Sequence, residues 1–465
     1  MYDEVLGYDI ESPSSIEEFA KGLREKTFRE ICKLDAQLNG ESDDSGEKKG
    51  NKGRLGQLVE ERYFHYRCNN NPTPDFEEAG VELKVSPFLE NKKGQITAKE
   101  RLVISLIDYC KVVEESFANS HMWKKAQKIL LVYYLYRKEI EDKLDYKIRF
   151  TGLFTPPEED LKIIRQDFET IKTKIRIGKA HELSGRDTLY LEAAPKGTKT
   201  SKNRKQPFSD VLAKPRAFAF KASYMTCVLN KYFVGGKQIE TIVNGPFEGT
   251  FEDHVLKRLS GYIGKSMDEL LEEYAISRKA KQYGALLAYR MLGIRGNSAE
   301  EFVKANVVVK TVRLLKKGKP KESMSFPLIR FDKLIKEEWD ESTFGNYLRN
   351  TRFLFMIYRE DKRGVPTFRG GQFWSMPYED LEIDVKTVWE KTRDLVREGL
   401  EIRIEQGKYR TNLPKLKDNR VSHVRPHADD SKDTCVLPDG RVIPKQCFWL
   451  NRLYVWSQLN KEFTD

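Results

Sequence analysis

Short sequence patterns occur twice in this chain, once in each half, and their order constrains the fold more than any other feature. Residues 55–60 (LGQLVE) match 283–288 (YGALLA), and residues 78–84 (EAGVELK) match 304–310 (KANVVVK). A helical pattern around Phe168 that ends at Gly178 matches one around Trp389 that ends at Gly399. Residues 216–219 (RAFA) match 446–449 (QCFW) more weakly. Matches in one shared order predict a tandem duplication of a single domain.

The length of the chain fits this interpretation. With 465 residues, we expect a first domain over residues 1–240 and a second over 245–465, each long enough to bury its own core. Hydrophobic residues make up 39% and charged residues 33% of the sequence, as in ordinary globular proteins. The net charge of +11 is compatible with a polyanionic partner such as nucleic acid.

Several classes of protein are not supported by the sequence. It holds no apolar run of the ~18 residues that a membrane-spanning helix needs. The first residues are acidic and lack the apolar core of a secretory signal, so we expect a cytoplasmic protein. The cysteines form no CxxC pair, which gives no support to a zinc site. His423 and His427 have the spacing of metal ligands but no partner ligands, so we interpret them as ordinary histidines.

The local patterns of the first half predict a mixed α/β fold, in which helices flank a mixed sheet. Residues 39–53 lack apolar side chains and predict a mobile loop. A helix follows, and a loop over 69–74 is dense in turn formers. The predicted strands are 80–85, 101–109 and 128–136, and a predicted helix covers 161–177. The run 128–136 is almost entirely apolar, which is typical of a central strand buried on both faces.

The segment 74–85 (PDFEEAGVELKV) is the most informative for chemistry. Asp75 lies at a turn, and Glu82 and Lys84 lie two residues apart on the next strand, so both project from the same face. The alternative interpretation, an ordinary charged strand face in a lysine-rich protein, remains open on this pattern alone. What favours a site is the context: a helix bearing Glu60, a Pro-Asp turn, the strand with Glu-x-Lys, and two further strands.

Two acids and a lysine suit the hydrolysis of a phosphodiester. Carboxylates such as Asp75 and Glu82 can hold Mg²⁺ through oxygen ligands. The metal lowers the pKa of a bound water and offsets phosphate charge. Lys84 can orient the attacking water or stabilise the transition state. Glu60 on the preceding helix can reach the same metal, and Lys125, just before the strand 128–136, can add a further positive charge.

These segments resemble a known family. Residues 56–60 (GQLVE), Asp75-Phe76 and 79–84 (AGVELK) resemble the motif block of MutH, the mismatch-repair endonuclease that nicks at GATC. Residues 99–103 (KERLV), 178–183 (GKAHEL) and 322–326 (ESMSF) resemble the related type II restriction enzymes that cut at GATC, which consist of two MutH-like domains in one chain. The resemblance extends over nearly the full length.

The resemblance implies a role for each matched residue. Asp75 and Glu82 would ligate Mg²⁺, Lys84 would serve the attacking water, and Glu60 and Lys125 would assist. Pro195-Lys196 matches the loop that reads the GATC bases, although the family's arginine before this proline is Ala194 here. The candidate DNA-binding residues of the first half are Lys99, Arg101, Lys196, Arg216 and Lys221.

The second half departs from the motif block. It has Ala288 at the position of Glu60, Glu301 for Asp75 and Val308 for Glu82, and only Lys310 remains, for Lys84. Losing these acids should abolish metal binding. Arg425-Pro426-His427 nevertheless resembles the family's Arg-Pro-Lys reading loop, so Arg425 and His427 are the candidate DNA-binding residues here. The resemblance implies a regulatory domain that binds a second copy of the site; the alternative is a degenerate domain kept for stability.

We therefore expect a type II restriction endonuclease that hydrolyses double-stranded DNA at GATC, 5′ of the G, and leaves 5′-phosphate ends. One working centre per chain implies a dimer on DNA, or two successive nicks. Two alternatives are a non-catalytic DNA-binding module, in which Glu82 and Lys84 form a solvated face, and a mismatch-repair GATC nickase, for which a single domain would suffice.

Overall fold

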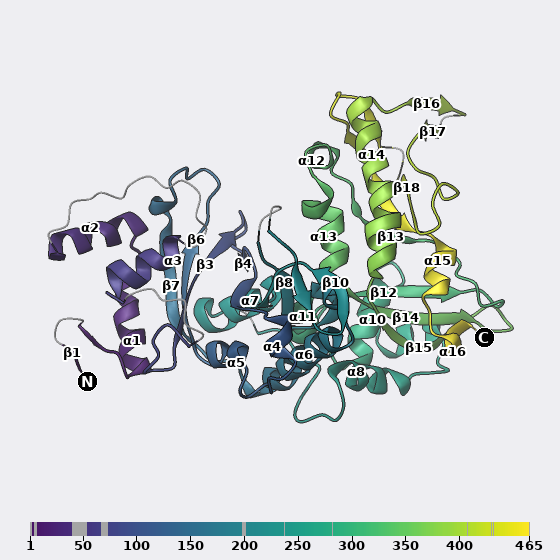
Figure 1. Ribbon diagram of the computed structural model, residues 1–465. Coiled ribbons are helices and arrows are strands. Elements are labelled where there is room, and N and C mark those ends of the chain that lie inside the picture. Colours follow the sequence, from purple (N-terminus) through teal and green to yellow (C-terminus); the bar gives the residue numbers. More distant parts are fainter. Residues whose placement is uncertain are drawn as a thin grey trace. The chain divides into compact units, whose positions relative to one another are not determined.

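The computed structural model describes most of the chain, in two compact units (Figure 1). The described residues are 2–3, 7–39, 54–66, 73–197, 201–236, 238–280, 282–406, 408–428, 430 and 432–464. Nearly all of the predicted loop 39–53, most of the turn-rich loop 69–74 and residues 198–200 of the basic segment 196–205 lie outside them. The first unit comprises residues 1–239 and 300–305, and the second comprises 240–299 and 306–465.

A four-stranded mixed sheet forms the centre of the first unit, in the order β4-β3-β6-β7 (Figure 1). Strand β3 (Glu82–Glu90) runs parallel to β6 (Ile129–Leu135), and β7 (Lys147–Phe154) and β4 (Ile96–Ala98) pair with them in antiparallel orientation. The sequence of β6 is apolar because it lies between two strands and both its faces are buried. The predicted central strand over 128–136 is confirmed.

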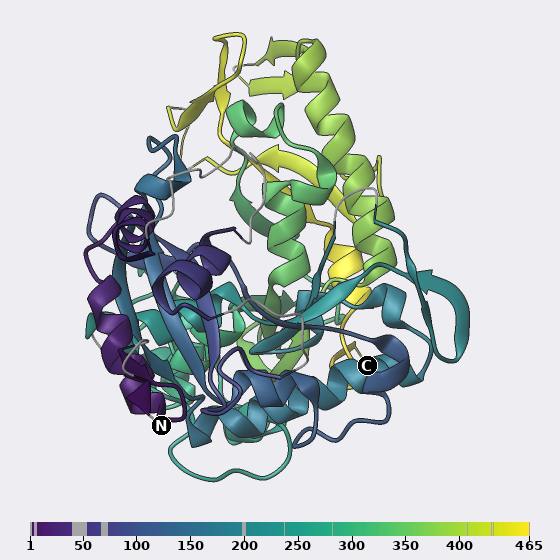
Figure 2. The same ribbon diagram turned by 60° about the vertical axis from the view of Figure 1, so that its left-hand side comes forward.

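Three helices cover one face of this sheet (Figure 2). They are α1 (Pro13–Ala20), α2 (Phe28–Asn39) and α3 (Arg54–Leu58). Their apolar side chains, including Ile16, Phe28 and Leu55, are buried in one cluster with Leu83 and Leu130 of the sheet. The predicted helix of this region is confirmed, and the chain continues from α3 into a wider helical turn, η2 (Val59–Tyr63), which the sequence did not predict.

A second, antiparallel sheet of the first unit has the order β5-β11-β8. Its strands are β5 (Leu102–Leu106), β11 (Arg216–Phe220) and β8 (Leu191–Pro195). The long helix α6 (Glu158–Arg176) packs on it through Phe168, whose ring stacks on Phe218 at 5.4 Å. Asp167 of α6 accepts hydrogen bonds from the backbone N–H groups of three residues at the start of β8, and burial raises its pKa to about 6. This carboxylate fixes the helix against the strand.

The second unit repeats this topology. Strand β12 (Val307–Leu314) runs parallel to β14 (Arg352–Glu360), which pairs in antiparallel orientation with β15 (Pro366–Trp374). A second sheet has the order β13-β21-β18, with bounds Met324–Leu328, Gln446–Leu450 and Ser422–Pro426. In each unit a small hairpin precedes the last strand of this sheet, β9–β10 in the first and β19–β20 in the second. The mixed α/β fold and the duplication of one domain were therefore predictable from the repeated patterns.

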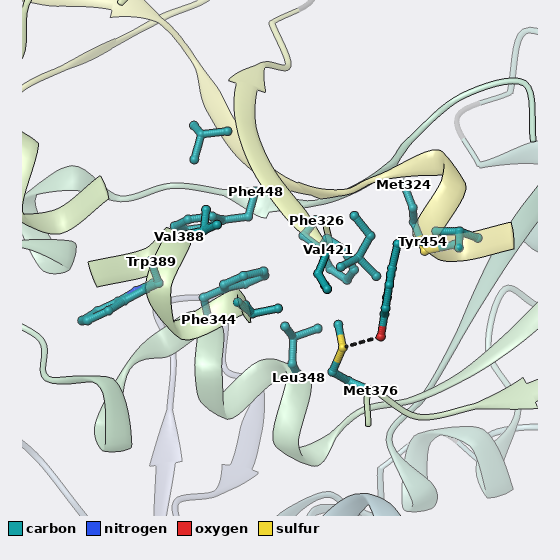
Figure 3. Close-up of a cluster of buried hydrophobic side chains, with 14 of the residues drawn as sticks. Met324, Phe326, Phe344, Leu348, Met376, Val388, Trp389, Val421, Phe448 and Tyr454 are labelled. Carbon is teal, nitrogen blue, oxygen red and sulfur yellow. Dashed lines mark hydrogen bonds between the residues drawn. The ribbon is translucent and has the colours of Figure 1, made fainter. Parts of the chain in front are cut away.

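Aromatic rings dominate the core of the second unit (Figure 3). Helices α13 (Thr343–Asn350) and α14 (Lys386–Glu398) contribute Phe344 and Trp389. Phe344 stacks on Phe448 of β21 with ring centroids 4.3 Å apart. Tyr454 contacts the sulfur of Met376 at 3.3 Å, the dashed line in Figure 3.

One helix of the second repeat belongs by its contacts to the first unit. This is α11 (Glu300–Ala305), directly before β12. Its buried Lys304 lies 2.7 Å from a carboxylate oxygen of Asp160 in α6 and 2.8 Å from Glu300. Glu301 is buried in the same helix.

The remaining elements are short. The helices and helical turns are η1 (Lys21–Leu23), α4 (Tyr109–Val112), α5 (His121–Ala126), η3 (Lys143–Asp145), η4 (Ala180–Glu182), η5 (Gly185–Asp187), α7 (Ala222–Val228), η6 (Leu229–Val234), α8 (Phe251–Ser260), α9 (Met267–Glu273), α10 (Tyr283–Met291), α12 (Phe331–Leu334), η7 (Trp339–Glu341), η8 (Asp380–Val385), α15 (Arg452–Ser457) and α16 (Lys461–Thr464). The strands are β1 (Tyr2–Asp3), β2 (Tyr8–Asp9), β9 (Arg204–Gln206), β10 (Ser209–Ala213), β16 (Ile402–Glu405), β17 (Lys408–Thr411), β19 (Thr434–Val436) and β20 (Val442–Pro444). Among the described residues, no helix has the length and apolar character needed to cross a membrane.

Candidate active site

A tight turn brings Asp75 beside Glu82. Phe76 and Val81 form an antiparallel bridge with hydrogen bonds of 2.9 and 3.1 Å, and Gly80 takes a positive φ of 63° in the turn between them. The backbone N–H of Asp75 donates to Glu82 at 3.2 Å, and the N–H of Leu83 donates to the Asp75 carboxylate at 2.9 Å. The two acids predicted from the sequence therefore lie side by side at the start of β3.

Two lysines face the same carboxylate. Lys84 follows two positions along β3 and its ammonium group donates to Glu82. Lys125 comes from α5, and its Nζ atom lies 3.1 and 3.2 Å from the two carboxylate oxygens of Glu82. The Glu82 side chain is only 1% exposed, so both contacts lie in surroundings that screen charge weakly. Four of the five predicted catalytic residues are thus brought together.

The electrostatics of Asp75 favour a cation. Burial raises the pKa of its carboxyl group, Lys84 opposes this, and the neighbouring negative charge of Glu82 raises it further. A divalent ion between the two acids would offset both unfavourable effects. The oxygen donors of Asp75 and Glu82 fit a hard cation such as Mg²⁺, which commonly takes one or two carboxylates and completes its shell with water and phosphate oxygens. No described group of three or more His, Cys, Asp or Glu side chains is arranged as a richer metal site.

The four residues open into a cleft of about 470 Å³. Its other walls come from β5, α4, α5 and β11, and the remaining lining residues are Ile104, Ser105, Leu106, Ile107, Asp108, Lys111, Val112, Glu115, His121, Met122 and Phe218. The sequence analysis missed Glu115 and His121, whose side chains contact each other on this wall. One signal was present, because His121 lies four residues before Lys125 and so on the same helix face.

Glu60 is the fifth predicted catalytic residue. It lies in η2, which follows α3, and its side chain is half-buried. It is not among the residues that line the cleft. Its role stays a prediction.

Three of the predicted DNA-binding residues of the first unit are accessible to varying degrees. Lys99 is exposed, with its ammonium group 4.4 Å from the centre of the Tyr136 ring. Arg101 forms an ion pair of 3.0 Å with the buried Glu192. Lys196 is exposed just after β8, and its backbone N–H donates to the carbonyl of Pro215 at 2.8 Å.

Arg216 and Lys221, the other two, are buried. The guanidinium of Arg216 donates to the carbonyl of Ala193 at 2.8 Å, and Lys221 donates to the carbonyl of Thr188 at 2.5 Å. Side chains held in this way stabilise the sheet around the reading loop. Contact of either with DNA stays a prediction, and the geometry favours a supporting role.

The strand register identifies the corresponding residues of the second unit. Lys84 pairs with Leu131, and a bulge follows two residues later, after Tyr133. Lys310 pairs with Phe355, and a bulge follows at the same distance, after Ile357. Val308 therefore takes the place of Glu82, as the sequence match predicts.

Lys310, the lysine that remains in the second unit, forms no ion pair with an acid among the described residues. Lys310 donates to the carbonyl of Ser325 at 2.8 Å and lies 5.4 Å from the centre of the Phe326 ring. Burial lowers its pKa. The other two predicted equivalents lie elsewhere: Ala288 is buried in α10, and Glu301 is buried in α11, which belongs to the first unit.

Rings occupy the cleft of the second unit. Its pocket is only about 120 Å³. Phe344 stands where the first unit has Met122, and Tyr347 stands where it has Lys125, because each lies at the same distance from the serine that caps its helix. Figure 3 shows Phe344 packed beside Phe448 at this place. The position of Lys125 is therefore taken by an aromatic ring, although Arg330 and Lys333 also line this pocket.

The reading loop of the second unit, in contrast, carries exposed side chains. Pro426 pairs with Gln446 as Pro195 pairs with Arg216, so Arg425 takes the place of Ala194. The exposed Arg425 guanidinium lies 4.1 Å from the centre of the Trp449 ring. His427 is exposed, and its ring lies edge-on to Trp449.

Comparison with known proteins supports this interpretation of the site. The family described as MutH, DNA mismatch repair enzyme MutH, matches residues 64–167, which include four of the five predicted catalytic residues. The type II restriction enzyme Sau3AI of Staphylococcus aureus is 37% identical over 430 residues, covering 87% of both chains. The DNA mismatch repair protein MutH of Shewanella sp. (strain W3-18-1) is 28% identical over 191 residues, covering 40% of this chain and 82% of that protein.

The two likenesses differ in extent. MutH matches part of the chain, whereas the restriction enzyme matches most of it, in agreement with two tandem domains. The residues of the cleft supply the acids and lysines that a phosphodiester hydrolase needs. The chain belongs to the family of MutH-like type II restriction endonucleases, and is a site-specific deoxyribonuclease.

Proposed function

We propose that the first unit hydrolyses one phosphodiester of double-stranded DNA at GATC, 5′ of the G, with Mg²⁺ as cofactor, and leaves a 5′-phosphate. The observation that carries this proposal is the contact of Glu82 with Asp75, Lys84 and Lys125 in one open cleft. Specificity for GATC rests on the resemblance of the Pro195-Lys196 loop to the reading loop of the family.

The side chains of the cleft would have different roles in the reaction. Asp75 and Glu82 would hold Mg²⁺, which when bound supplies charge stabilisation to the phosphodiester and a lower pKa to the attacking water. Lys84 lies beside Glu82 and would orient that water and stabilise negative charge on the phosphoryl oxygens. Lys125 contacts both oxygens of the Glu82 carboxylate and would add positive charge where the phosphate enters.

The second unit would bind a second GATC copy and act as an allosteric effector. Support comes from a contrast within this unit: the cleft is filled by rings, while Arg425 and His427 are exposed on the reading loop. An exposed arginine stacked on an indole is well placed for bidentate contact with guanine. With one catalytic cleft per chain, we propose that two chains meet on the DNA to cut both strands.

The test is digestion of a GATC plasmid with Mg²⁺. We expect cleavage at GATC, mapped to the bond 5′ of the G, and no cleavage by a Lys84→Ala variant that still retards the DNA when Ca²⁺ replaces Mg²⁺. Wild-type protein that binds but never cleaves would reduce the chain to a DNA-binding module. Nicking without double-strand cuts would favour the repair-type activity.

A further inference from the structure

The hairpin β9–β10 of the first unit carries an unusual surface. Its turn consists of Pro207 and Phe208, between the paired residues Gln206 and Ser209. Phe208 has a φ of 62° and its side chain is 75% exposed. Turns of this kind normally place glycine or asparagine at a positive φ, because a side chain crowds the backbone there. A bulky ring kept at such a position, in water, indicates a function for the ring.

The hairpin is firmly anchored next to its turn. The buried Gln206 side chain accepts from the N–H of Ala180 at 2.7 Å and donates to the carbonyl of Val211 at 2.5 Å. Gly178 lies against the turn so closely that a Cβ atom there would come within 2.6 Å of the Phe208 carbonyl oxygen. The hairpin also packs on α4, a wall of the catalytic cleft. The turn that carries Phe208 is therefore positioned by the body of the first unit before any partner binds.

The surroundings of the ring combine apolar and basic groups, and the exposed Asp210 of β10 adds an acid. Val211 and Leu212 on β10 and Ile177 at the end of α6 are at least half exposed. Arg204 and Lys205 on β9 are exposed and form no ion pair with any described residue. The segment 196–205 that leads into the hairpin contains five lysines and arginines and no acid.

The corresponding hairpin of the second unit has the opposite character. At its turn, Leu437 is buried, and Asp439 forms an ion pair of 2.7 Å with Arg441. Arg441 also donates to the carbonyl of Leu400 at 2.7 Å, so this turn is folded back onto the body of its unit. The projecting ring is thus a property of the catalytic repeat and not of the shared fold.

We propose that this hairpin is a DNA-binding element of the first unit, in which Phe208 packs against bases or sugars in a groove while Arg204 and Lys205 contact the flanking phosphates. Charge favours this partner, because an apolar tip next to the two cations of β9 matches a groove bordered by phosphates. A second copy of the chain carries a net charge of +11 and would be repelled by the same cations. The inference deepens the proposed function and rests on it.

The first experiment uses single-turnover cleavage of a short duplex with one GATC, because the cut reports DNA bound to the first unit. Phe208→Ala should raise the half-saturating protein concentration by about tenfold, the loss expected when one aromatic contact with a base is removed. The rate at saturation should stay unchanged, since the ring touches none of the reacting groups. Phe208→Trp should restore tight binding. Val436→Ala, on a valine of the second hairpin that is 64% exposed, is the control and should have no effect.

Two further variants separate DNA contact from structure. Phe208→Gly suits the positive φ, so its melting temperature should equal or exceed that of the wild type while DNA binding weakens. Arg204→Ala/Lys205→Ala should reduce the slope of log affinity against log salt by about 2, the value for two lost phosphate contacts, measured with Ca²⁺ by fluorescence anisotropy. Phe208→Ala should leave that slope unchanged.

The outcomes are distinguishable. Wild-type half-saturation in both Phe208→Ala and Phe208→Gly would overturn the proposal. So would a loss of self-association in sedimentation without a change in DNA binding, which would assign the patch to a contact between copies. If the wild type fails to cleave GATC, the proposed function falls. The anisotropy measurement in Ca²⁺ then still tests the hairpin, because phosphate and groove contacts do not require that sequence.

Discussion

Strands β3 and β12 have the same place in their units, but the two lysines on them, Lys84 and Lys310, have different surroundings. Lys84 lies beside Glu82 and within reach of substrate, with two acids and a second lysine around it. Lys310 instead donates a hydrogen bond to a carbonyl group and lies near an aromatic ring. The backbone is retained to the residue, including the bulge, while the site on it is lost. Catalysis therefore depends on the side chains around this lysine more than on the strand that carries it.

Substitution of Lys84 and substitution of Lys310 should differ most in their effect on the cleavage rate. Lys84→Ala should lower the single-turnover rate on a one-site duplex by about 10²–10³-fold, as for the removal of a group that stabilises transition-state charge. Lys310→Ala should leave that rate unchanged. Equal losses in both variants would mean that the second unit contributes to the chemistry, and the comparison would fail.

For DNA binding through the reading loop, the large effect should come from the second unit. Arg425→Ala should weaken binding to a GATC duplex by about 1–3 kcal/mol if it contacts a guanine, in a Lys84→Ala background where cleavage cannot interfere. Wild-type protein should cut a two-site plasmid faster than a one-site plasmid, and Arg425→Ala should abolish that advantage. Unchanged affinity together with an unchanged two-site advantage would leave the second unit with a structural role only.

Metal binding should be confined to the first unit. Burial raises the pKa of Asp75, and an acid of this kind stabilises the fold only while it is protonated, so the contribution is lost as the pH rises through the raised pKa. At neutral pH without metal, Asp75→Asn should therefore raise the melting temperature, since asparagine can still accept from Leu83. Ca²⁺ should stabilise the wild type and leave the variant unaffected; a remaining Ca²⁺ effect would locate a second metal site.

The smallest expected effect concerns Lys310 itself. A lysine whose pKa is lowered by burial destabilises the fold while it is protonated, and stability rises as the pH climbs from the lowered pKa toward the ordinary value of about 10.4. Lys310→Met should raise the stability at neutral pH by about 1 kcal/mol, measured by urea unfolding, and the gain should vanish at high pH. The matched Lys84→Met should be destabilising, because it leaves Glu82 with one cation fewer.

The parts of the site that are close in sequence could be predicted. Asp75, Glu82 and Lys84 lie within a turn and one strand, and the alternation of a strand places the last two on one face. Lys125 was proposed from its place just before the strand 128–136 and was then matched through the resemblance, and its contact with Glu82 depends on α5 preceding β6, the parallel partner of β3. The apolar run of β6 and the helical spacing of α6 gave the layers of the fold for the same local reasons.

What could not be predicted depends on contacts between distant segments. Strand β7 was not predicted, although its first four residues alternate charged and apolar side chains as in a half-buried strand, and it completes the sheet beside β6. Predicted strand 101–109 pairs not with β3 or β6 but with β11, more than a hundred residues later. The burial of Arg216 follows from that pairing. No local pattern distinguishes an arginine directed into the sheet from one directed to DNA.

Helix α11 has a consequence for how this protein is made. The helix is encoded after the first 240 residues, yet its Lys304 supplies the positive charge for Asp160, a buried carboxylate of the first unit. A ribosome that has released only the catalytic repeat has therefore not released all of the chain that this repeat needs, and burying Asp160 without its partner is strongly unfavourable. The nuclease is completed only after the start of the second repeat has been synthesised. A fragment intended to hold the catalytic unit alone should extend through residue 305.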